Sequence, residues 1–147
     1  LLRDQIPAEW DAVRAELAQV QSDLFALGSH MANDLPEMVA RLPHIDPAWI
    51  ARLEAAIDRM DVDLEPMRNF LLPGGHVLVS QCHVVRTVAR RAERWVVQLV
   101  DQLGADDVPL PAPTVAYLNR LSDYAFTLSR WLGKQLNAPE IPWISKT

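Results

Sequence analysis

Apolar residues recur at spacings of three and four along four long segments, and this periodicity is the strongest constraint on the fold of the chain. Such spacing gathers apolar side chains on one face of an α-helix. We therefore expect helices at about 7–31, 47–64, 77–103 and 114–136. The positions that define them are Val13, Leu17, Val20, Leu24, Leu27 and Met31; Ile50, Leu53, Ile57, Met60 and Leu64; Leu78, Cys82, Val85, Val88 or Ala89, Ala92, Val96 and Leu99; and Val115, Leu118, Leu121, Ala125, Leu128 and Leu132.

Turn and cap residues separate these segments. Pro7 suits the first turn of a helix, and Asp46-Pro47 combines an N-cap with a proline at the first helical position. Pro73-Gly74-Gly75 predicts a turn, and residues 104–113 form a loop rich in Asp and Pro. No strand pattern or glycine-rich phosphate loop is recognisable. The sequence predicts an all-α fold, an antiparallel bundle of four long helices.

Length and composition fit one domain. The 147 residues, half of them apolar, suffice for one core and are too few for two, so we expect residues 1–147 to form a single helical domain. The net charge of -5 argues against general nucleic-acid binding. No apolar run approaches the roughly 18 residues of a membrane span, and no signal peptide is recognisable. The single cysteine, Cys82, suits the core and a reducing compartment, so we expect a cytoplasmic protein.

Within this acidic chain, residues 86–94 carry four arginines and one glutamate. At about 100° per residue, Arg86, Arg90 and Glu93 share one helical face. The planar, permanently charged guanidinium group suits phosphate oxygens. We interpret the segment as a local polyanion site, and a surface helix joined by ion pairs is the alternative.

Two further motifs flank this arginine segment. Arg68-Asn-Phe-Leu-Leu-Pro-Gly-Gly75 precedes it, and Tyr117-Leu-Asn-Arg-Leu-Ser-Asp-Tyr-Ala-Phe126 follows it. Together with the closing Glu140-Ile-Pro-Trp143, the three motifs resemble those of the PduO-type ATP:cob(I)alamin adenosyltransferases. Weaker similarity around Gln21–Gly28 extends the resemblance from about residue 15 to the C-terminus.

The resemblance implies transfer of the 5′-deoxyadenosyl group of ATP to the cobalt of reduced corrinoid, cob(I)alamin. Because the cobalt is the nucleophile, the protein needs neither a catalytic triad nor an activated cysteine. The resemblance also implies a fifth, N-terminal helix, of which residues 1–5 would be the last turn, and a homotrimer with sites between subunits. It suggests a flavin reductase and a B12-dependent acceptor enzyme as partners. The Thr/Gly-rich ATP loop and an acidic corrinoid-side residue of the family's N-terminal segment do not occur in this sequence.

For the nucleotide, Arg86 and Arg90 are the catalytic candidates, because guanidinium groups can stabilise the charge that grows on the leaving triphosphate. Mg²⁺ prefers oxygen ligands and keeps waters and substrate phosphates, and the resemblance assigns Glu93 and Asn119 to Mg-ATP. As an alternative, Glu93 and Asp123 simply pair with Arg90 and Arg120. The residues expected at ATP are Arg86, Arg90, Arg91, Glu93, Asn119 and Arg120.

For the corrinoid, the resemblance places Phe70 at the lower face of the ring. A phenyl group cannot coordinate cobalt and excludes water, so a four-coordinate cobalt that is easier to reduce becomes accessible. Without the resemblance, Phe70 would be an ordinary core aromatic. Arg68 is expected to anchor the glycine turn, after which His76 replaces the Ser or Thr of many relatives. The residues expected at the corrinoid are Arg68, Asn69, Phe70, Asp123 and Phe126.

Other functions stay open beside the enzyme. A non-catalytic corrinoid carrier or escort would keep the bundle and Phe70, and a structural bundle would use its arginines in interchain salt bridges. A ferritin-like di-metal protein needs Glu-x-x-His pairs on two helices, and none is present. The histidines have no metal-ligand spacing, and we expect them in loops or at the surface. They are His30, His44, His76 and His83.

Overall fold

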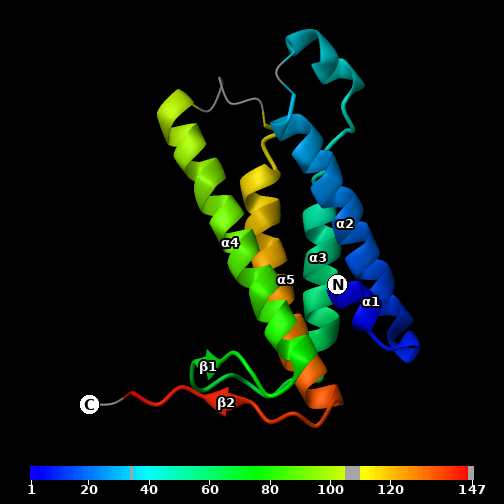
Figure 1. Cartoon of the computed structure of the whole chain (residues 1–147), viewed down its shortest axis with the longest axis vertical. Helices are drawn as coiled ribbons and strands as arrows, with labels where there is room; N and C mark the ends of the chain where they lie inside the picture. The colour runs from blue at the N-terminus through cyan, green and yellow to red at the C-terminus, as the bar shows by residue number, and fades with distance from the viewer. Residues whose placement is uncertain (34, 105–109, 146–147) are drawn as a thin grey trace.

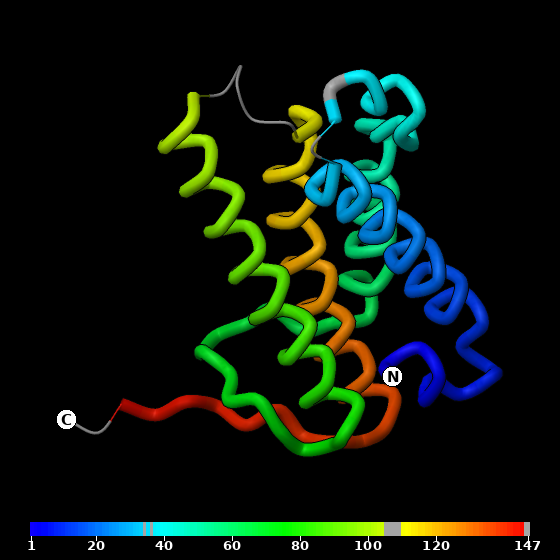
Figure 2. The backbone as a smooth tube through the Cα atoms, turned by 45° about the horizontal axis from the view of Figure 1, so that its top comes forward, coloured from blue at the N-terminus to red at the C-terminus, as the bar shows by residue number. Residues whose placement is uncertain are grey.

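Four long helices that run alternately up and down make up most of the computed structural model, which describes residues 1–33, 35–104 and 110–145 (Figure 1). The tube in Figure 2 shows the same antiparallel bundle from a second direction. The predicted all-α fold is confirmed. The long helices are α2 (Asp11–Met31), α3 (Ala48–Asp61), α4 (Val77–Leu103) and α5 (Thr114–Gln135).

Short elements precede α2 and α3. The helix α1 (Leu2–Gln5) lies where a last helical turn was expected, and the 3₁₀ helix η2 (Pro36–Arg41) follows α2. The expected helix start at Pro7 is wrong, because Pro7 precedes a separate 3₁₀ helix, η1 (Ala8–Trp10), and α2 begins only after it. Of the expected loop 104–113, residues 105–109 lie outside the described part of the chain.

Two further differences concern the segment between α3 and α4 and the C-terminal tail. α3 ends before Leu64, because turn bonds from Asp63 N–H to the Met60 carbonyl and from Leu64 N–H to the Asp61 carbonyl close the chain there. The strands β1 (Leu71–Leu72) and β2 (Ile141–Pro142) form a small antiparallel sheet that the sequence did not predict. Two residues are too short to show an alternating pattern.

The helix α5 lies at the centre of the bundle, between α4 and α3 (Figure 1). Its buried face supplies the largest share of the core, as the apolar spacing predicts. Three positions of the predicted stripes are exposed instead, namely Leu24, Met31 and Val88, and Ala89 faces the core in place of Val88. Across the described part of the chain, we find no helix whose length and hydrophobicity would let it span a bilayer.

A buried carboxylate joins α2 to both of its neighbours. Asp23, only 1% exposed, accepts a hydrogen bond from Arg52 of α3 at 2.6 Å and one from the Tyr117 hydroxyl of α5 at 2.9 Å. Gln19 donates a third bond at 3.0 Å. Burial, and then the adjacent carboxylate, raise the pKa of Tyr117 far above its usual value, so the hydroxyl stays protonated and acts as a donor.

A second cluster repeats this arrangement further along the bundle. Glu16 of α2 accepts hydrogen bonds from Arg59 of α3 and from the Tyr124 hydroxyl of α5, the latter at 3.0 Å. Burial, and then Glu16, raise the pKa of Tyr124 well above its usual value, and the bond to Glu16 raises the pKa of Arg59. In each helix the two members of the repeat are about two helical turns apart, so both clusters lie on the same helical faces.

Asp23→Ala should lower the free energy of unfolding by about 2–4 kcal/mol, because it leaves the buried Tyr117 hydroxyl and the Arg52 guanidinium without their acceptor. The Arg52 side chain is 40% exposed, so water recovers part of its loss. Urea unfolding followed by circular dichroism measures the effect. Asp58→Ala, which removes an exposed carboxylate of α3, should stay within about 0.5 kcal/mol. Equal effects of the two substitutions would contradict the structural role of Asp23.

Candidate active site

The arginine segment lies on α4, and part of it meets α5 as the sequence predicts. Arg90 donates to one oxygen of Glu93 at 2.5 Å, and the Asn119 amide donates to the other at 3.0 Å. Glu93 is 13% exposed, so these bonds hold its carboxylate at the α4–α5 interface. Three residues of the expected ATP set are therefore brought together by two hydrogen bonds.

The three other arginines of residues 86–94 lie outside this cluster. Arg91 and Arg94 line a separate surface hollow of about 330 Å³ with Trp95 and Gln98. At about 100° per residue, Arg91 and Arg94 point away from the face that carries Arg86, Arg90 and Glu93. Arg86 is partly buried one turn before Arg90 and contacts His83.

Arg120 is engaged by carboxylates of two helices. It pairs with Asp123 of α5 at 2.9 Å and with Glu54 of α3 at 3.0 Å. The pairs of Arg120 with Asp123 and of Arg90 with Glu93 are those of the alternative interpretation, and the pair with Glu54 was not expected. The structure thus joins Arg120 to Asp123 although they were assigned to different substrates, and a bound nucleotide would have to compete for Arg120.

Phe70 is exposed at an open hollow, and its interpretation as a core aromatic is wrong. The side chain is 74% exposed, and its ring meets that of Trp143 edge to face with centroids 6.5 Å apart. The backbone N–H of Trp143 donates to the Phe70 carbonyl at 2.7 Å, which continues the pairing of β1 and β2. The hollow has a volume of about 500 Å³ and is lined by Met67, Arg68, Asn69, Phe70, Trp143, Ile144 and Ser145.

Sequence reasoning placed Arg68, Asn69 and Phe70 together and missed Trp143 as their neighbour. The signal was the closing tail motif, but its position beside Phe70 depends on the unpredicted sheet. Phe126, from the same expected set, lies instead against His83, with ring centroids 6.2 Å apart. Neither Phe126 nor Asp123 lines the hollow at Phe70.

The glycine turn after β1 is held by backbone geometry. Gly75 has φ +90°, and a Cβ there would lie 3.3 Å from the Pro139 carbonyl oxygen of the tail. His76 follows as the N-cap of α4, and its Nδ1 accepts the Leu78 N–H at 3.1 Å, so an imidazole provides the capping acceptor. Among the described residues, no hydrogen bond joins Arg68 to this turn, and the expected anchoring is not supported.

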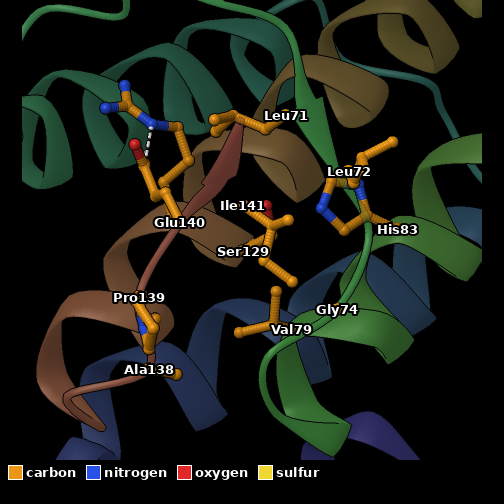
Figure 3. Close-up of a pocket in the computed structure, with 12 residues that line it drawn as sticks. Leu71, Leu72, Gly74, Val79, His83, Ser129, Ala138, Pro139, Glu140 and Ile141 are labelled. Atoms are coloured by element: carbon orange, nitrogen blue, oxygen red, sulfur yellow. Dashed lines mark hydrogen bonds and ion pairs between the residues drawn. The ribbon is translucent and has the colours of Figure 1, made fainter. Parts of the chain in front are cut away.

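A small cavity of about 20 Å³ lies beneath the paired strands, between the start of α4 and the end of α5 (Figure 3). One wall is closed by Arg130, which donates to Glu140 of the tail at 2.6 Å. The cavity is lined by Leu71, Leu72, Gly74, Val79, His83, Ser129, Arg130, Gly133, Ala138, Pro139, Glu140 and Ile141.

The expectation that the histidines lie in loops or at the surface is wrong for two of them. His30 is buried on α2 and bonds the Pro43 carbonyl at 2.8 Å, and His83 is buried on α4. Both follow the apolar spacing of their helices, which could have indicated burial. Cys82 is buried as predicted, and burial raises the pKa of its thiol to about 12. In the described residues, no group of three or more His, Cys, Asp or Glu side chains could hold a metal ion.

Comparison with known proteins shows the family to which the chain belongs. Residues 1–132 match the family described as cobalamin adenosyltransferase. The chain belongs to this family. It is 37% identical to the corrinoid adenosyltransferase PduO of Salmonella typhimurium over 80% of this chain and 33% of that protein. It is 42% identical to the corrinoid adenosyltransferase of Mycobacterium tuberculosis over 78% of this chain and 58% of that protein.

A solved structure supports the family assignment at the level of the fold. The F112A variant of the PduO-type ATP:corrinoid adenosyltransferase from Lactobacillus reuteri, complexed with cobalamin and ATP, superposes with a TM-score of 0.83 at 27% identity. The match covers 98% of this chain and 77% of that one. The present chain spans 33% and 58% of the length of the two curated relatives. The match therefore concerns only part of each curated relative.

Gly75→Ala should lower the free energy of unfolding by about 1–2 kcal/mol, because it combines a strained backbone with a close approach to the tail. Gly28→Ala is the matched control. A Cβ at Gly28 meets nothing within 4 Å inside the chain, so this substitution in α2 should stabilise by about 0.5–1 kcal/mol. Urea unfolding of both variants checks the opposite signs, and stabilisation by Gly75→Ala would show that the turn carries no strain.

Proposed function

We propose that this chain transfers the 5′-deoxyadenosyl group of ATP to the cobalt of a reduced corrinoid, giving adenosylcobalamin and triphosphate. Family membership and the Lactobacillus complex with cobalamin and ATP support the proposal. The observation that carries it on this chain is the exposed Phe70 at an open hollow. An exposed aromatic ring that packs only edge-on against another exposed ring contributes little to a core, and it offers an apolar face to a flat ligand.

In the proposed step, an electron pair of Co(I) attacks the 5′ carbon of ATP. The Co–C bond forms as the C5′–O bond breaks, and the electron pair of that bond leaves on the triphosphate, so the cobalt becomes formally Co(III). Arg86 and Arg90 stabilise the growing negative charge. A unit-charge pair about 4 Å apart contributes roughly 4 kcal/mol at an effective dielectric constant near 20. Glu93 orients Arg90, and Arg91 and Arg120 complete the proposed nucleotide set.

Mg²⁺ is proposed to accompany ATP. Both oxygens of Glu93 already accept hydrogen bonds, while the amide oxygen of Asn119 points away from that carboxylate because the amide nitrogen is the donor. Two oxygen-bearing side chains are too few for a protein-only site, but they fit an ion that keeps waters and substrate phosphates. When bound there, the ion would neutralise part of the triphosphate charge.

On the corrinoid side, Phe70 is proposed to cover the lower face of the ring and to exclude water and axial ligands from the cobalt. Arg68 and Asn69 share its hollow and would contact polar groups of the corrinoid. Asp123 and Phe126 complete the set proposed from the family resemblance. Neither residue lines the Phe70 hollow of its own chain, and this supports a site completed by a neighbouring subunit.

We also propose a cytoplasmic homotrimer in which residues 1–147 form one helical domain. Large exposed apolar side chains on α2 and α4, among them Phe25, Val84 and Trp95, support association with further copies of the chain. A flavin reductase and a B12-dependent acceptor enzyme are the proposed partners. Sedimentation equilibrium of the isolated protein tests the trimer.

An anaerobic spectroscopic assay tests the activity. The protein is prepared with the N-terminal segment that its relatives carry, and it is mixed with ATP, Mg²⁺ and chemically reduced cobalamin. The loss of the Co(I) band is followed in the visible spectrum. Formation of adenosylcobalamin above the no-protein control is the expected result. A spectral shift of bound corrinoid without turnover would favour the carrier or escort, and no shift would contradict corrinoid binding altogether.

Arg90→Ala should reduce turnover in this assay by at least about a hundredfold, since a guanidinium that stabilises the leaving triphosphate is removed. The far-ultraviolet circular dichroism should stay unchanged. Arg94→Ala, which removes an exposed arginine from the same helix outside the Glu93 cluster, is the matched control and should keep most of the activity. Turnover of Arg90→Ala at the wild-type rate would refute the triphosphate assignment.

Phe70→Ala should impair reduction of enzyme-bound Co(II) more than it impairs ATP binding, because water and axial ligands regain access to the cobalt. Spectroelectrochemical titration of bound cobalamin and calorimetry with ATP measure the two effects separately. Val62→Ala, at another exposed apolar side chain, is the control. Equal loss of both properties would assign Phe70 a merely structural role.

A further inference from the structure

His83 is a buried ionisable residue of α4 that lies one turn before Arg86. Its side chain and backbone together are 6% exposed. The Nε–H of Arg86 donates to Nδ1 of the imidazole over a long distance of 3.4 Å, and the ring packs edge-on against Phe126 of α5. The ring also lines the small cavity beneath β1 and β2 (Figure 3). His83 thus touches elements of both halves of the proposed site.

We propose that His83 is a positioning residue that holds the Arg86 side chain for the triphosphate through a neutral imidazole acceptor. The inference rests on the proposed function of Arg86. A free arginine side chain samples many rotamers, and ordering it in advance reduces the entropy lost when phosphate binds. The bond to His83 uses only Nε–H. The four N–H groups on the two terminal nitrogens therefore remain available for a bidentate contact with phosphate.

The packing fixes the ring as well as its tautomer. Because Nδ1 is the acceptor, the proton of the neutral ring lies on Nε2. Phe126 contacts the ring with an interplanar angle of 65°, which restricts its rotation. The cavity beside the ring has room for about one water molecule, which would satisfy Nε2–H without displacing the ring. His83 thereby connects the position of Arg86 to Phe126.

Burial and the nearby positive charge of Arg86 favour the neutral form of the His83 ring. Burial, and then the Arg86 charge, lower the pKa of His83 below its usual value of 6.5. The other charged groups at the ring's cavity, Arg130 of α5 and Glu140 of the tail, pair with each other, and β1 contributes only apolar side chains. The neutral ring is therefore present at pH 7, and the bond to Arg86 is lost as the pH falls through the lowered pKa of His83.

The test compares His83→Leu with His83→Asn in the adenosylation assay at pH 8. His83→Leu removes the acceptor and should lower kcat/KM for ATP by about tenfold or more. His83→Asn should retain most of the activity, because its amide oxygen can take the place of Nδ1. In the wild type, kcat/KM should fall as the pH drops through the pKa of His83, which is lowered below its usual value, and this acid limb should be absent from His83→Asn, whose amide does not titrate.

A double-mutant cycle separates positioning from folding. In an Arg86→Ala background, His83→Leu should cause no further loss, because there is no guanidinium left to hold. Additive losses in the double variant, with Arg86→Ala alone strongly impaired but still measurable, would overturn the positioning role and leave the function of Arg86 intact. Wild-type turnover of Arg86→Ala would overturn the assignment of Arg86 together with this inference. Equal loss in His83→Asn and His83→Leu, with unchanged stability in urea, would also overturn it.

Discussion

The carboxylate of Asp23 sets the rotation of the central helix, and the candidate site depends on that rotation. Its bond to the Tyr117 hydroxyl turns that side of α5 toward α2. Asn119 follows two residues later, roughly 200° further around the helix, and therefore faces α4, where it bonds Glu93. Glu16 and Tyr124 repeat the constraint lower in the bundle. A purely apolar contact is non-directional and would allow α5 to turn about its axis more freely.

Local patterns predicted the helices and part of the site, while contacts between distant residues escaped them. Apolar periodicity gave α4 its observed bounds, and Arg90 and Glu93 were grouped because they are three residues apart on one helix. The partners of Tyr117 and Tyr124 lie 94 and 108 positions away in the sequence, and no local pattern connects them. The two clusters are seven residues apart on each of α2, α3 and α5. This spacing indicates paired clusters only once it is known which helical faces meet.

The histidines and the end of α3 show where residue type misled the sequence reasoning. His83 was expected in a loop or at the surface because the histidines lack metal-ligand spacing, although its spacing from Val79 continues the buried stripe of α4. Leu64 was assigned to the apolar stripe of α3, but the chain had already turned after Asp61. For His83 the position on the helix determined the environment, and for Leu64 the end of the helix did, so side-chain type alone was misleading in both cases.

The pairing of β1 with β2 gives the end of the chain a place beside Phe70. Only four residues form the sheet, yet they bring Trp143 to a motif that lies on the far side of two long helices in the sequence. The bundle core is complete without this tail, because no residue after α5 belongs to the buried apolar cluster of the described chain apart from the partly buried Leu136. The residue beside Phe70 can therefore change without a change to the bundle core, so the shape of the hollow and the stability of the bundle can be selected separately.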